Sequence, residues 1–329
     1  MAKTLITGAT GFLGSHLLPR LDPSDLRLLS RSSAPEGAAD VVEGSILDVE
    51  AVRRAVDGVE QIFHLAGKVS RDPDDVRELY RVHVEGTAIL CREAAAAGVK
   101  RIVLASTSGT IAVSDDEESL PDEESPVPLE LIGGWPYYTS KLYQEQVAER
   151  ECASGGAPEL VILNPSLLLG PGDHRLSSTE DVLKLLSGDI PVHPPGGVNF
   201  VDVRDVAFAF DRAMTEGRAG ERYLLGGPNW TFAMFFDKLA RLAKTKAPIA
   251  KLPESMYLLA GRTVDAFYRH WDKAPPVDRI SVEMGRRFWY LDASKAEREL
   301  GFRARDPYET LGDTVAFIKR EFLGDGVLR

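Results

Sequence analysis

The chain has 329 residues, of which 44% are hydrophobic and 27% charged, so it can bury a large core and is not composed like a disordered protein. Its formal net charge of −11 disfavours a nucleic-acid partner, because affinity for a phosphate backbone comes mostly from lysine and arginine. Two cysteines, Cys91 and Cys152, are too few for a disulfide framework and have no metal-ligand spacing, so we expect a cytoplasmic protein without a metal. The first apolar run ends soon after Leu5 and Ile6, so we expect neither a signal peptide nor a membrane span.

Short apolar strands alternate with helical patterns through the first half of the sequence. The patterns predict strands at 3–7, 26–30, 40–44, 60–67, 100–107 and 159–170, and helices from Phe12, at 49–56, at 74–97 and from Pro136. Strands that are apolar on both faces and separated by amphipathic helices are typical of a parallel sheet covered on both sides. The sequence therefore predicts an α/β protein with a doubly wound Rossmann sheet.

The second half of the sequence loses this alternation after Gly170. It has loops rich in proline, glycine and serine, helical patterns at 231–244 and 254–270, and a strand pattern at 286–292. We predict a main domain over 1–170 and a smaller C-terminal lobe over 171–329, from which a segment at about 198–226 returns to the main domain. The acidic stretch at 114–126 is predicted to be a solvated surface loop.

The first predicted strand runs into the sequence TGATGFLG, which places glycines at positions 8, 11 and 14 before a helix. A turn of this kind points backbone N–H groups at the positive end of a helix dipole, where a pyrophosphate binds. Gly8 can take the positive φ of the tight turn, Gly11 lets the diphosphate approach, and Gly14 lets the helix lie close to the strand. We predict an NAD(P)-binding main domain whose loop contacts are Gly8, Thr10, Gly11, Phe12, Leu13 and Gly14.

The end of the second predicted strand bears on the choice of cofactor. An acidic residue there binds a ribose 2′-hydroxyl, whereas arginine binds a 2′-phosphate. The sequence LRLLSRSS places Arg31 and Ser32 at this point, which favours NADP(H) over NAD(H). An exposed arginine without a ligand is the alternative that the sequence leaves open.

A second group of reactive side chains lies in WPYYTSK at 135–141. Pro136 suits the first turn of a helix, and Tyr137 precedes Lys141 by four residues, which stacks the two on one helix face. A free phenol has a pKa of about 10, so tyrosine exchanges protons at neutral pH only when a nearby cation stabilises its phenolate. Upstream, LASTSG ends a strand in hydroxyl residues at the sheet edge where ligands bind in such folds.

In this order, the motifs TGATGFLG, FHLAG, LASTSG, Tyr137-x-x-x-Lys141, NPSLLLGPGD, FVDVRDVA and LDASKAERELGF resemble the extended short-chain dehydrogenase/reductase family over essentially the whole chain. The resemblance implies that Thr107 orients the substrate and that Tyr137 is the general acid/base. It also implies that Lys141 binds the nicotinamide ribose and lowers the pKa of Tyr137. Ser106 and Ser108 are neighbours that could take the place of Thr107.

The resemblance also implies further contacts. The additional cofactor contacts are Ile46, Asp48, Leu65, Ala66, Gly67, Asn164 and Pro165, and the candidate pocket residues are Ser108, Trp135, Leu167, His174 and Arg175. His64 is expected to be a packed histidine at a strand end, and Tyr138 to pack in its helix or line the pocket. His83 stands where the family usually has asparagine and is given no role.

The cations available near the predicted substrate pocket bear on which substrate the chain can bind. Sugar-nucleotide members of the family resemble one another in an arginine just before the segment written here FVDV, whereas this chain has Val198 and Asn199. The stretches at 167–178 and 252–271 mix aliphatic and aromatic residues with few cations, and burying a diphosphate without cations is costly. The chain most resembles the dihydroflavonol-4-reductase-like branch, which implies NADPH-dependent reduction of a ketone or aldehyde on a fairly apolar small molecule.

Two other functions stay open at this point. One is a sugar or sugar-nucleotide epimerase/dehydratase with tightly bound NAD, and the other is a regulator that senses a dinucleotide without catalysis. The family also commonly dimerises through a helix bundle, which implies a possible homodimer through the helices at 74–97 and 136–153.

Overall fold

The computed structural model describes residues 3–31, 40–190, 192–248, 250–251 and 279–324. A seven-stranded parallel sheet lies at its centre, and the first six strands have the 3-2-1-4-5-6 order of a Rossmann sheet. In spatial order, its strands are β10 (Arg222–Leu225), β6 (Glu159–Pro165), β5 (Arg101–Ala105), β4 (Gln61–His64), β1 (Thr4–Thr7), β2 (Leu26–Ser30) and β3 (Val41–Glu43). The order reverses between β1 and β4, and ligands bind beyond the carboxyl ends of the strands at such a reversal. The predicted doubly wound α/β fold is confirmed.

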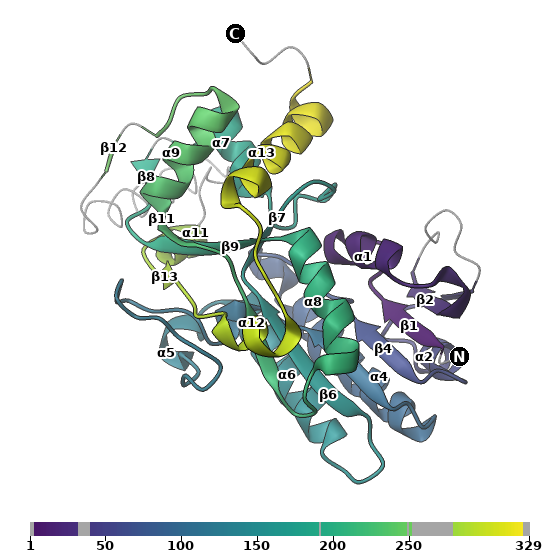
Figure 1. Cartoon of the computed structure of the whole chain (residues 1–329). Coiled ribbons are helices and arrows are strands. Elements are labelled where there is room, and N and C mark those ends of the chain that lie inside the picture. Colours follow the sequence, from purple (N-terminus) through teal and green to yellow (C-terminus); the bar gives the residue numbers. More distant parts are fainter. Residues whose placement is uncertain (1–2, 32–39, 191, 249, 252–278, 325–329) are drawn as a thin grey trace.

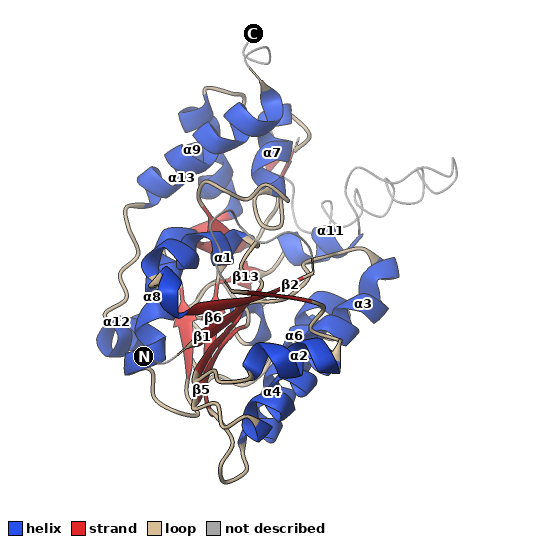
Figure 2. Cartoon of the chain, turned by 90° about the vertical axis from the view of Figure 1, so that its right-hand side faces the viewer, coloured by secondary structure: helices blue, strands red, loops and turns tan. Residues whose placement is uncertain are grey.

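Helices cover both faces of this sheet, as Figure 2 shows. One face carries α1 (Phe12–Leu17), α8 (Val203–Glu216) and α12 (Ser294–Leu300), and the other carries α2 (Val49–Val56), α4 (Gly86–Ala96) and α6 (Pro136–Cys152). Alternate residues of each strand enter the two cores: Leu5 faces one and Ile6 the other. Because both faces are buried, the strands are continuous apolar runs.

The helix predicted at 74–97 is divided into distinct segments. It starts with a 3₁₀ turn (Pro73–Asp75), continues as α3 (Val76–Tyr80), widens into a π-helical turn (Arg81–Glu85) and ends as α4. A π-helical turn inserted in an α-helix shifts the side chains that follow it, and such turns are frequent at functional sites. The sequence pattern predicts the helix but not this turn, which contains the buried His83.

The C-terminal lobe lies above the main sheet in Figure 1. Its sheets contain β7 (Leu167–Leu169), β9 (Gly197–Asp202), β11 (Asn229–Thr231) and β13 (Phe288–Trp289), with a separate pair β8 (Val192–His193) and β12 (Ala250–Lys251). Its helices are α7 (Glu180–Ser187), α9 (Phe232–Ala243), α11 (Arg279–Gly285) and α13 (Pro307–Ile318), and a short α5 (Leu129–Ile132) precedes the catalytic helix. The strand predicted at 286–292 is only two residues long here, and the helix predicted at 254–270 lies outside the described residues.

The motif FVDVRDVA joins the lobe to the main domain. Asp202 caps the start of α8, where its Oδ1 accepts from the backbone N of Arg204 at 2.9 Å. The guanidinium of Arg204 bridges Asp202 and Asp313 of α13 at 2.7 Å each, and Arg305 pairs with Asp205 at 2.8 Å. The buried carboxylate of Asp202 is thus neutralised by the cations around it, as a buried charge requires.

The acidic stretch at 114–126 is not simply a solvated loop. Asp115 pairs with Arg287 and, at 3.2 Å, with Arg286, and Glu123 Oε1 accepts from the backbone N of Leu224 at 2.8 Å. The last contact covers a backbone donor of the edge strand β10. Asp115 is exposed as expected, with its side chain 54% accessible, whereas the expectation of a solvated loop is wrong at Glu123, which is half-buried against β10. None of the helices in the described ranges combines the length and apolar character that a bilayer crossing requires.

Candidate active site

The glycine loop has the geometry that a bound diphosphate needs. Gly8 has φ +77°, and a Cβ added there would lie 2.7 Å from the backbone of Leu65 and Ala66. A Cβ on Gly14 would overlap the carbonyl of Gly8, so strand and helix can lie this close only with glycine. Gly11 is the N-cap of α1, and a Cβ there would meet only the Gly8 oxygen within 4 Å. The space beside Gly11 is therefore open at the helix N-terminus, and the loop fits a dinucleotide.

The other residues predicted to contact the cofactor from the glycine loop differ in burial. Phe12 and Leu13 are buried in the core between α1 and α8, so only their backbone N–H groups can face a ligand. Thr10 is exposed. Thr7 Oγ1 accepts from the backbone N of Ala66 at 3.2 Å, which joins the end of β1 to the segment after β4.

The adenosine side of the site is less enclosed. Arg31 follows β2 and is exposed, and Ser32 lies outside the described residues. Ile46 is buried, with its side chain against Gly86. Asp48 is the N-cap of α2 and accepts from the backbone N of Glu50 and Ala51, so its Oδ1 is already used in the helix cap.

Helix α6 carries Tyr137 and Lys141, the predicted catalytic pair, one turn apart. Lys141 Nζ donates to the carbonyl of Ala105 at 2.6 Å and to Gln144 Oε1. Burial lowers the pKa of Lys141 to about 7, and burial raises the pKa of Tyr137 above its ordinary value. The lowered pKa of Tyr137 that the resemblance implies is thus not a property of the chain alone. The chain buries the phenol, which favours its neutral form.

A chain of buried hydrogen bonds connects Lys141 to the strand before the glycine loop. Gln144 Nε2 donates to Thr87 Oγ1 at 2.9 Å, and Thr87 Oγ1 lies 2.8 Å from His64 Nε2. His64 Nδ1 lies 2.8 Å from Thr7 Oγ1. Burial lowers the pKa of His64 to about 3, so the ring is neutral and packed at the strand end. Because the strand β1 ends at Thr7, these hydrogen bonds tie Lys141 to the glycine loop.

His83 has a structural place that its departure from asparagine did not suggest. Its Nε2 accepts from the backbone N of Lys68 at 3.1 Å, so Nδ1 carries the ring hydrogen and donates to Ser140 Oγ at 2.8 Å. Ser140 in turn donates to the carbonyl of Tyr137 at 2.7 Å. Burial holds the pKa of His83 well below its usual value, so the neutral ring links the segment after β4 to the catalytic helix.

The hydroxyl residues after β5 differ in burial. Ser106 and Ser108 are 6% and 4% exposed, whereas Thr107 is more exposed. Thr107 Oγ1 accepts from the backbone N of Gly109 at 3.3 Å, which leaves its hydroxyl hydrogen available. Asn164 is fully buried, and its Nδ2 donates to the carbonyl of Thr107 at 3.0 Å. The side-chain amide of Asn164 thus faces the protein and not the open side of the site.

An aromatic wall, formed by Trp135, Tyr138 and Trp289, lies beside Tyr137. The indole of Trp135 stacks on Trp289 with ring centroids 5.5 Å apart. The ring of Tyr138 lies 5.0 Å from both Tyr137 and Trp289. Tyr138 therefore packs against Tyr137, at the edge of a core cluster that includes Trp135, 2% exposed, and Trp289, 9% exposed. Trp289 was not singled out in the sequence, because it comes from β13, far along the chain.

Arg71 is a second residue that the sequence reasoning missed. It lies in the segment between β4 and α3 and reaches the lobe, where it bonds Ser281 Oγ at 3.1 Å and Asp181 at 3.3 Å. Burial raises the pKa of Tyr138 to about 12. The positive charge of Arg71 opposes this rise, and the negative charge of Asp181 adds to it. A lone arginine in a loop gives no sequence signal for such a bridge.

The remaining pocket candidates lie in the lobe. Leu167 packs against the core of the lobe. The His174 ring lies 5.2 Å from Phe317, its Nδ1 is 4.0 Å from Glu321, and its side chain is 68% exposed. Arg175 is exposed beside it. His174 thus contacts the C-terminal end of α13 and the turn after it, and its place in the substrate pocket stays a prediction.

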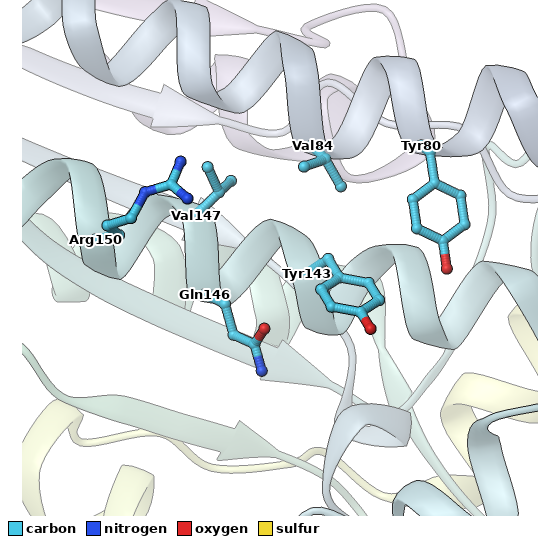
Figure 3. A pocket seen from close by; sticks show the side chains of 6 residues that line it. All are labelled: Tyr80, Val84, Tyr143, Gln146, Val147 and Arg150. Carbon is cyan, nitrogen blue, oxygen red and sulfur yellow. The ribbon is translucent and has the colours of Figure 1, made fainter.

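Figure 3 shows a groove on the outer face of α6. Its volume is about 550 Å³, and it is lined by Tyr80, Val84, Tyr143, Gln146, Val147 and Arg150. The rings of Tyr80 and Tyr143 lie 6.0 Å apart across it. None of the residues predicted to be catalytic lines this groove.

In the described part of the chain, no three His, Cys, Asp or Glu side chains gather in a way that could hold a metal ion.

The sequence matches the NAD dependent epimerase/dehydratase family over residues 4–226, which include the glycine loop, Tyr137 and Lys141. The chain belongs to this family. Its members act on carbinol or carbonyl groups with a nicotinamide cofactor, so the chain is an NAD(P)-dependent enzyme of the extended short-chain dehydrogenase/reductase type.

Relatives in this family place the chain in the dihydroflavonol-4-reductase-like branch. It is 32% identical to a Synechocystis protein named "Putative dihydroflavonol 4-reductase", over 94% of this chain and 92% of that protein. It is 31% identical to sterol demethylase protein B of Methylococcus capsulatus, over 96% and 98% of the two chains. Cinnamoyl-CoA reductase 1 of Oryza sativa subsp. japonica is 32% identical over 68% of this chain and 70% of that protein.

Solved structures share the same fold. The crystal structure of gox2253 superposes with a TM-score of 0.83 at 29% identity, covering 98% of this chain and 99% of that one. DesIV, a dTDP-glucose 4,6-dehydratase from Streptomyces venezuelae solved with NAD and DAU, superposes with a TM-score of 0.75 at 22% identity. The match covers 96% and 97% of the two chains. At that identity the second likeness shows the fold alone.

Proposed function

We propose that this family member is an NADP(H)-dependent oxidoreductase that reduces a ketone or aldehyde on a fairly apolar small molecule. The observation that carries the proposal is the placement of Tyr137 and Lys141 on one face of α6, with the aromatic wall next to Tyr137. These aromatic side chains make the surroundings of Tyr137 apolar, which favours an apolar skeleton over a charged sugar nucleotide.

The position before FVDV supports the same choice. Asn199 is buried, and its Nδ2 donates to the carbonyl of Gly227 at 2.8 Å and to Asn229 Oδ1 at 2.7 Å. Its Oδ1 accepts from the backbone N of Gly227 at 3.0 Å. These bonds hold β11 against β9 and use the side chain for the fold, so no cation is available there for a substrate diphosphate.

In the proposed reaction, a dinucleotide held by the glycine loop and Lys141 would supply the hydride that reduces the carbonyl carbon. Tyr137 donates its phenolic proton to the carbonyl oxygen, which its raised pKa allows because the phenol is protonated at neutral pH. Thr107 donates its hydroxyl hydrogen to the same oxygen and orients the carbonyl. Lys141 binds the nicotinamide ribose, and its ammonium stabilises the phenolate that Tyr137 leaves behind.

The preference for NADP(H) rests on Arg31. Its guanidinium follows β2 at the sheet edge where the adenosine ribose of a dinucleotide lies in this fold, and it is exposed enough to reach a 2′-phosphate. We further propose that residues 1–170 hold the cofactor and that 171–329 mainly shape the substrate side. In this division, α8 and β10 belong to the main domain.

Cofactor binding is the first test. NADPH and NADH are titrated by fluorescence into the purified protein and its Arg31→Asp variant, and the protein is checked for nucleotide that co-purifies. We expect exchangeable NADPH binding that weakens at least about tenfold in Arg31→Asp, because a charged hydrogen bond is lost and a carboxylate meets the phosphate. Tightly retained NAD that does not exchange would overturn this assignment and favour an epimerase or dehydratase.

Turnover is the second test. Apolar ketones and aldehydes are screened for NADPH oxidation, with Tyr137→Phe as the control that retains the ring. Turnover that Tyr137→Phe lacks supports the reductase. Absence of turnover with every carbonyl, together with tight NADPH binding, would favour a dinucleotide-sensing regulator.

We also propose a homodimer in the cytoplasm. The groove of Figure 3 supports it, because it lies between the two helices for which the family resemblance implies a dimer bundle, and Tyr143 is 46% exposed there. Sedimentation velocity of the wild type and Tyr143→Glu tests the dimer. A monomeric wild type would contradict it.

A further inference from the structure

Glu145 is a buried acid for which the proposed reaction has no use. It lies on α6 one turn beyond Lys141, and its side chain is 0% exposed. Burying a carboxylate is costly unless it is paired and hydrogen-bonded, so its surroundings show what it stabilises. Tyr137, Lys141 and Glu145 share one helix face at successive turns.

The partners of Glu145 flank the predicted catalytic threonine. Its Oε1 accepts from Ser106 Oγ, from Thr110 Oγ1 at 2.9 Å and from Asn164 Nδ2 at 2.7 Å. Its Oε2 lies 3.2 Å from Arg222 Nη1. All four partners present hydrogens to an acceptor, which suits an ionised carboxylate. Burial raises the pKa of Glu145, and Arg222 and the hydrogen bonds oppose that rise.

The same partners also hold the main chain of Thr107. The carbonyl of Thr107 accepts from Asn164 Nδ2 at 3.0 Å. It also lies 2.9 Å from Thr110 Oγ1, whose single hydrogen it shares with Glu145 Oε1. On the other side of Thr107, the carbonyl of Ala105 accepts from Lys141 Nζ. Helix α6 therefore fixes the segment 105–110 at both ends, through Lys141 and through Glu145.

We propose that Glu145 is a positioning residue, whose buried carboxylate fixes the backbone of Thr107 relative to the helix that carries Tyr137 and Lys141. This inference rests on the proposed reductase function, because the carbonyl reduction needs the Thr107 hydroxyl in place. An error of about 1 Å in such a group costs up to about 100-fold in rate.

The test is a kinetic comparison with a matched control on the same helix. Glu145→Gln keeps the shape of the side chain but replaces one carboxylate oxygen by an amide NH2, which cannot accept from the surrounding donors. We therefore expect kcat to fall about 10- to 100-fold with little change in NADPH affinity. Glu149→Gln is the control, because Glu149 also binds Arg222, at 2.7 Å, but is exposed and lies one turn further from the site. Its kcat should match that of the wild type.

A double-mutant cycle separates positioning from general damage. If Glu145 acts through Thr107, Glu145→Gln should cost less than about threefold in a Thr107→Val background. Equal losses in both backgrounds, or an unchanged kcat in Glu145→Gln alone, would overturn the inference. Thr110→Val, which keeps the charge paired, is the second variant if Glu145→Gln does not fold, and we expect a smaller loss of kcat that also vanishes with Thr107→Val.

Hydrogen exchange measured by mass spectrometry decides the inference if no carbonyl is turned over. That result would contradict the proposed function, while the exchange of residues 105–112 still reports on the segment. Faster exchange by about tenfold in Glu145→Gln, with Glu149→Gln like the wild type, supports the clamp. Unchanged exchange overturns it.

Discussion

The glycine loop and the segment around Thr107 both follow a strand near the centre of the main sheet, but different contacts hold them. The glycine loop is fixed by backbone shape, through the positive φ of Gly8 and the close approach of Gly14. The 105–110 segment is fixed by buried side chains, with Lys141 on one side of Thr107 and Glu145 on the other. The glycine loop excludes added atoms at Gly8 and Gly14, whereas the 105–110 segment depends on charges and hydrogen-bond partners.

The largest expected effect tests the chemical centre between these regions. Tyr137→Phe removes the phenolic hydroxyl and keeps the ring against Tyr138, so kcat should fall by about 10²- to 10⁴-fold while NADPH affinity is unchanged. Steady-state kinetics and fluorescence titration measure the two quantities. Residual turnover above a tenth of the wild-type rate would mean that another group supplies the proton.

The second prediction concerns the shape of the glycine loop. Gly8→Ala should destabilise the fold by about 3 kcal/mol and abolish cofactor binding, because it adds φ strain and an overlap with the backbone after β4. Gly58→Ala is the control, with φ +68° but no neighbour within 4 Å, and should cost only about 1 kcal/mol. Urea unfolding measures both, and equal costs would show that the close approach does not matter.

The third prediction concerns the buried charge of Lys141, which holds the segment around Thr107 through the carbonyl of Ala105. Since the pKa of Lys141 is about 7 in the folded protein and higher in the unfolded chain, the unfolded state binds more protons above pH 7. The stability of the cofactor-free protein should rise from pH 7 to 9 relative to Lys141→Met, by up to about 1.4 kcal/mol per pH unit. Parallel curves of unfolding free energy against pH would refute the lowered pKa.

The smallest expected effect concerns the contact between the acidic loop and the edge strand of the sheet. Glu123→Ala removes the acceptor of the Leu224 backbone N on the edge strand and should cost about 1 kcal/mol. Glu124→Ala, next to it and exposed, should cost almost nothing. Thermal unfolding of both variants decides whether the acidic loop stabilises the sheet or only covers it.

The sequence was informative wherever the physics is local. Helix α2 and the strand of each βα unit were predicted from periodicity, because burial on both faces gives continuous apolar runs. The π-helical turn at Arg81–Glu85 was not predicted, because it preserves the apolar pattern of the helix around it. The contacts of His174 with Phe317 and Glu321 were not predicted for a related reason, since nothing local shows which helix a loop side chain will meet.

By itself, the amino-acid sequence determined the Rossmann sheet, the glycine loop and the stacking of Tyr137 and Lys141, because each depends on residues within a few turns of one another. Only the tertiary structure decided the partners of Glu145, the bridge from Arg71 to the lobe and the aromatic wall with Trp289. These contacts join residues brought together by the folded sheet and lobe. A hydrogen-bond partner is chosen by distance in space, and no spacing along the chain encodes it.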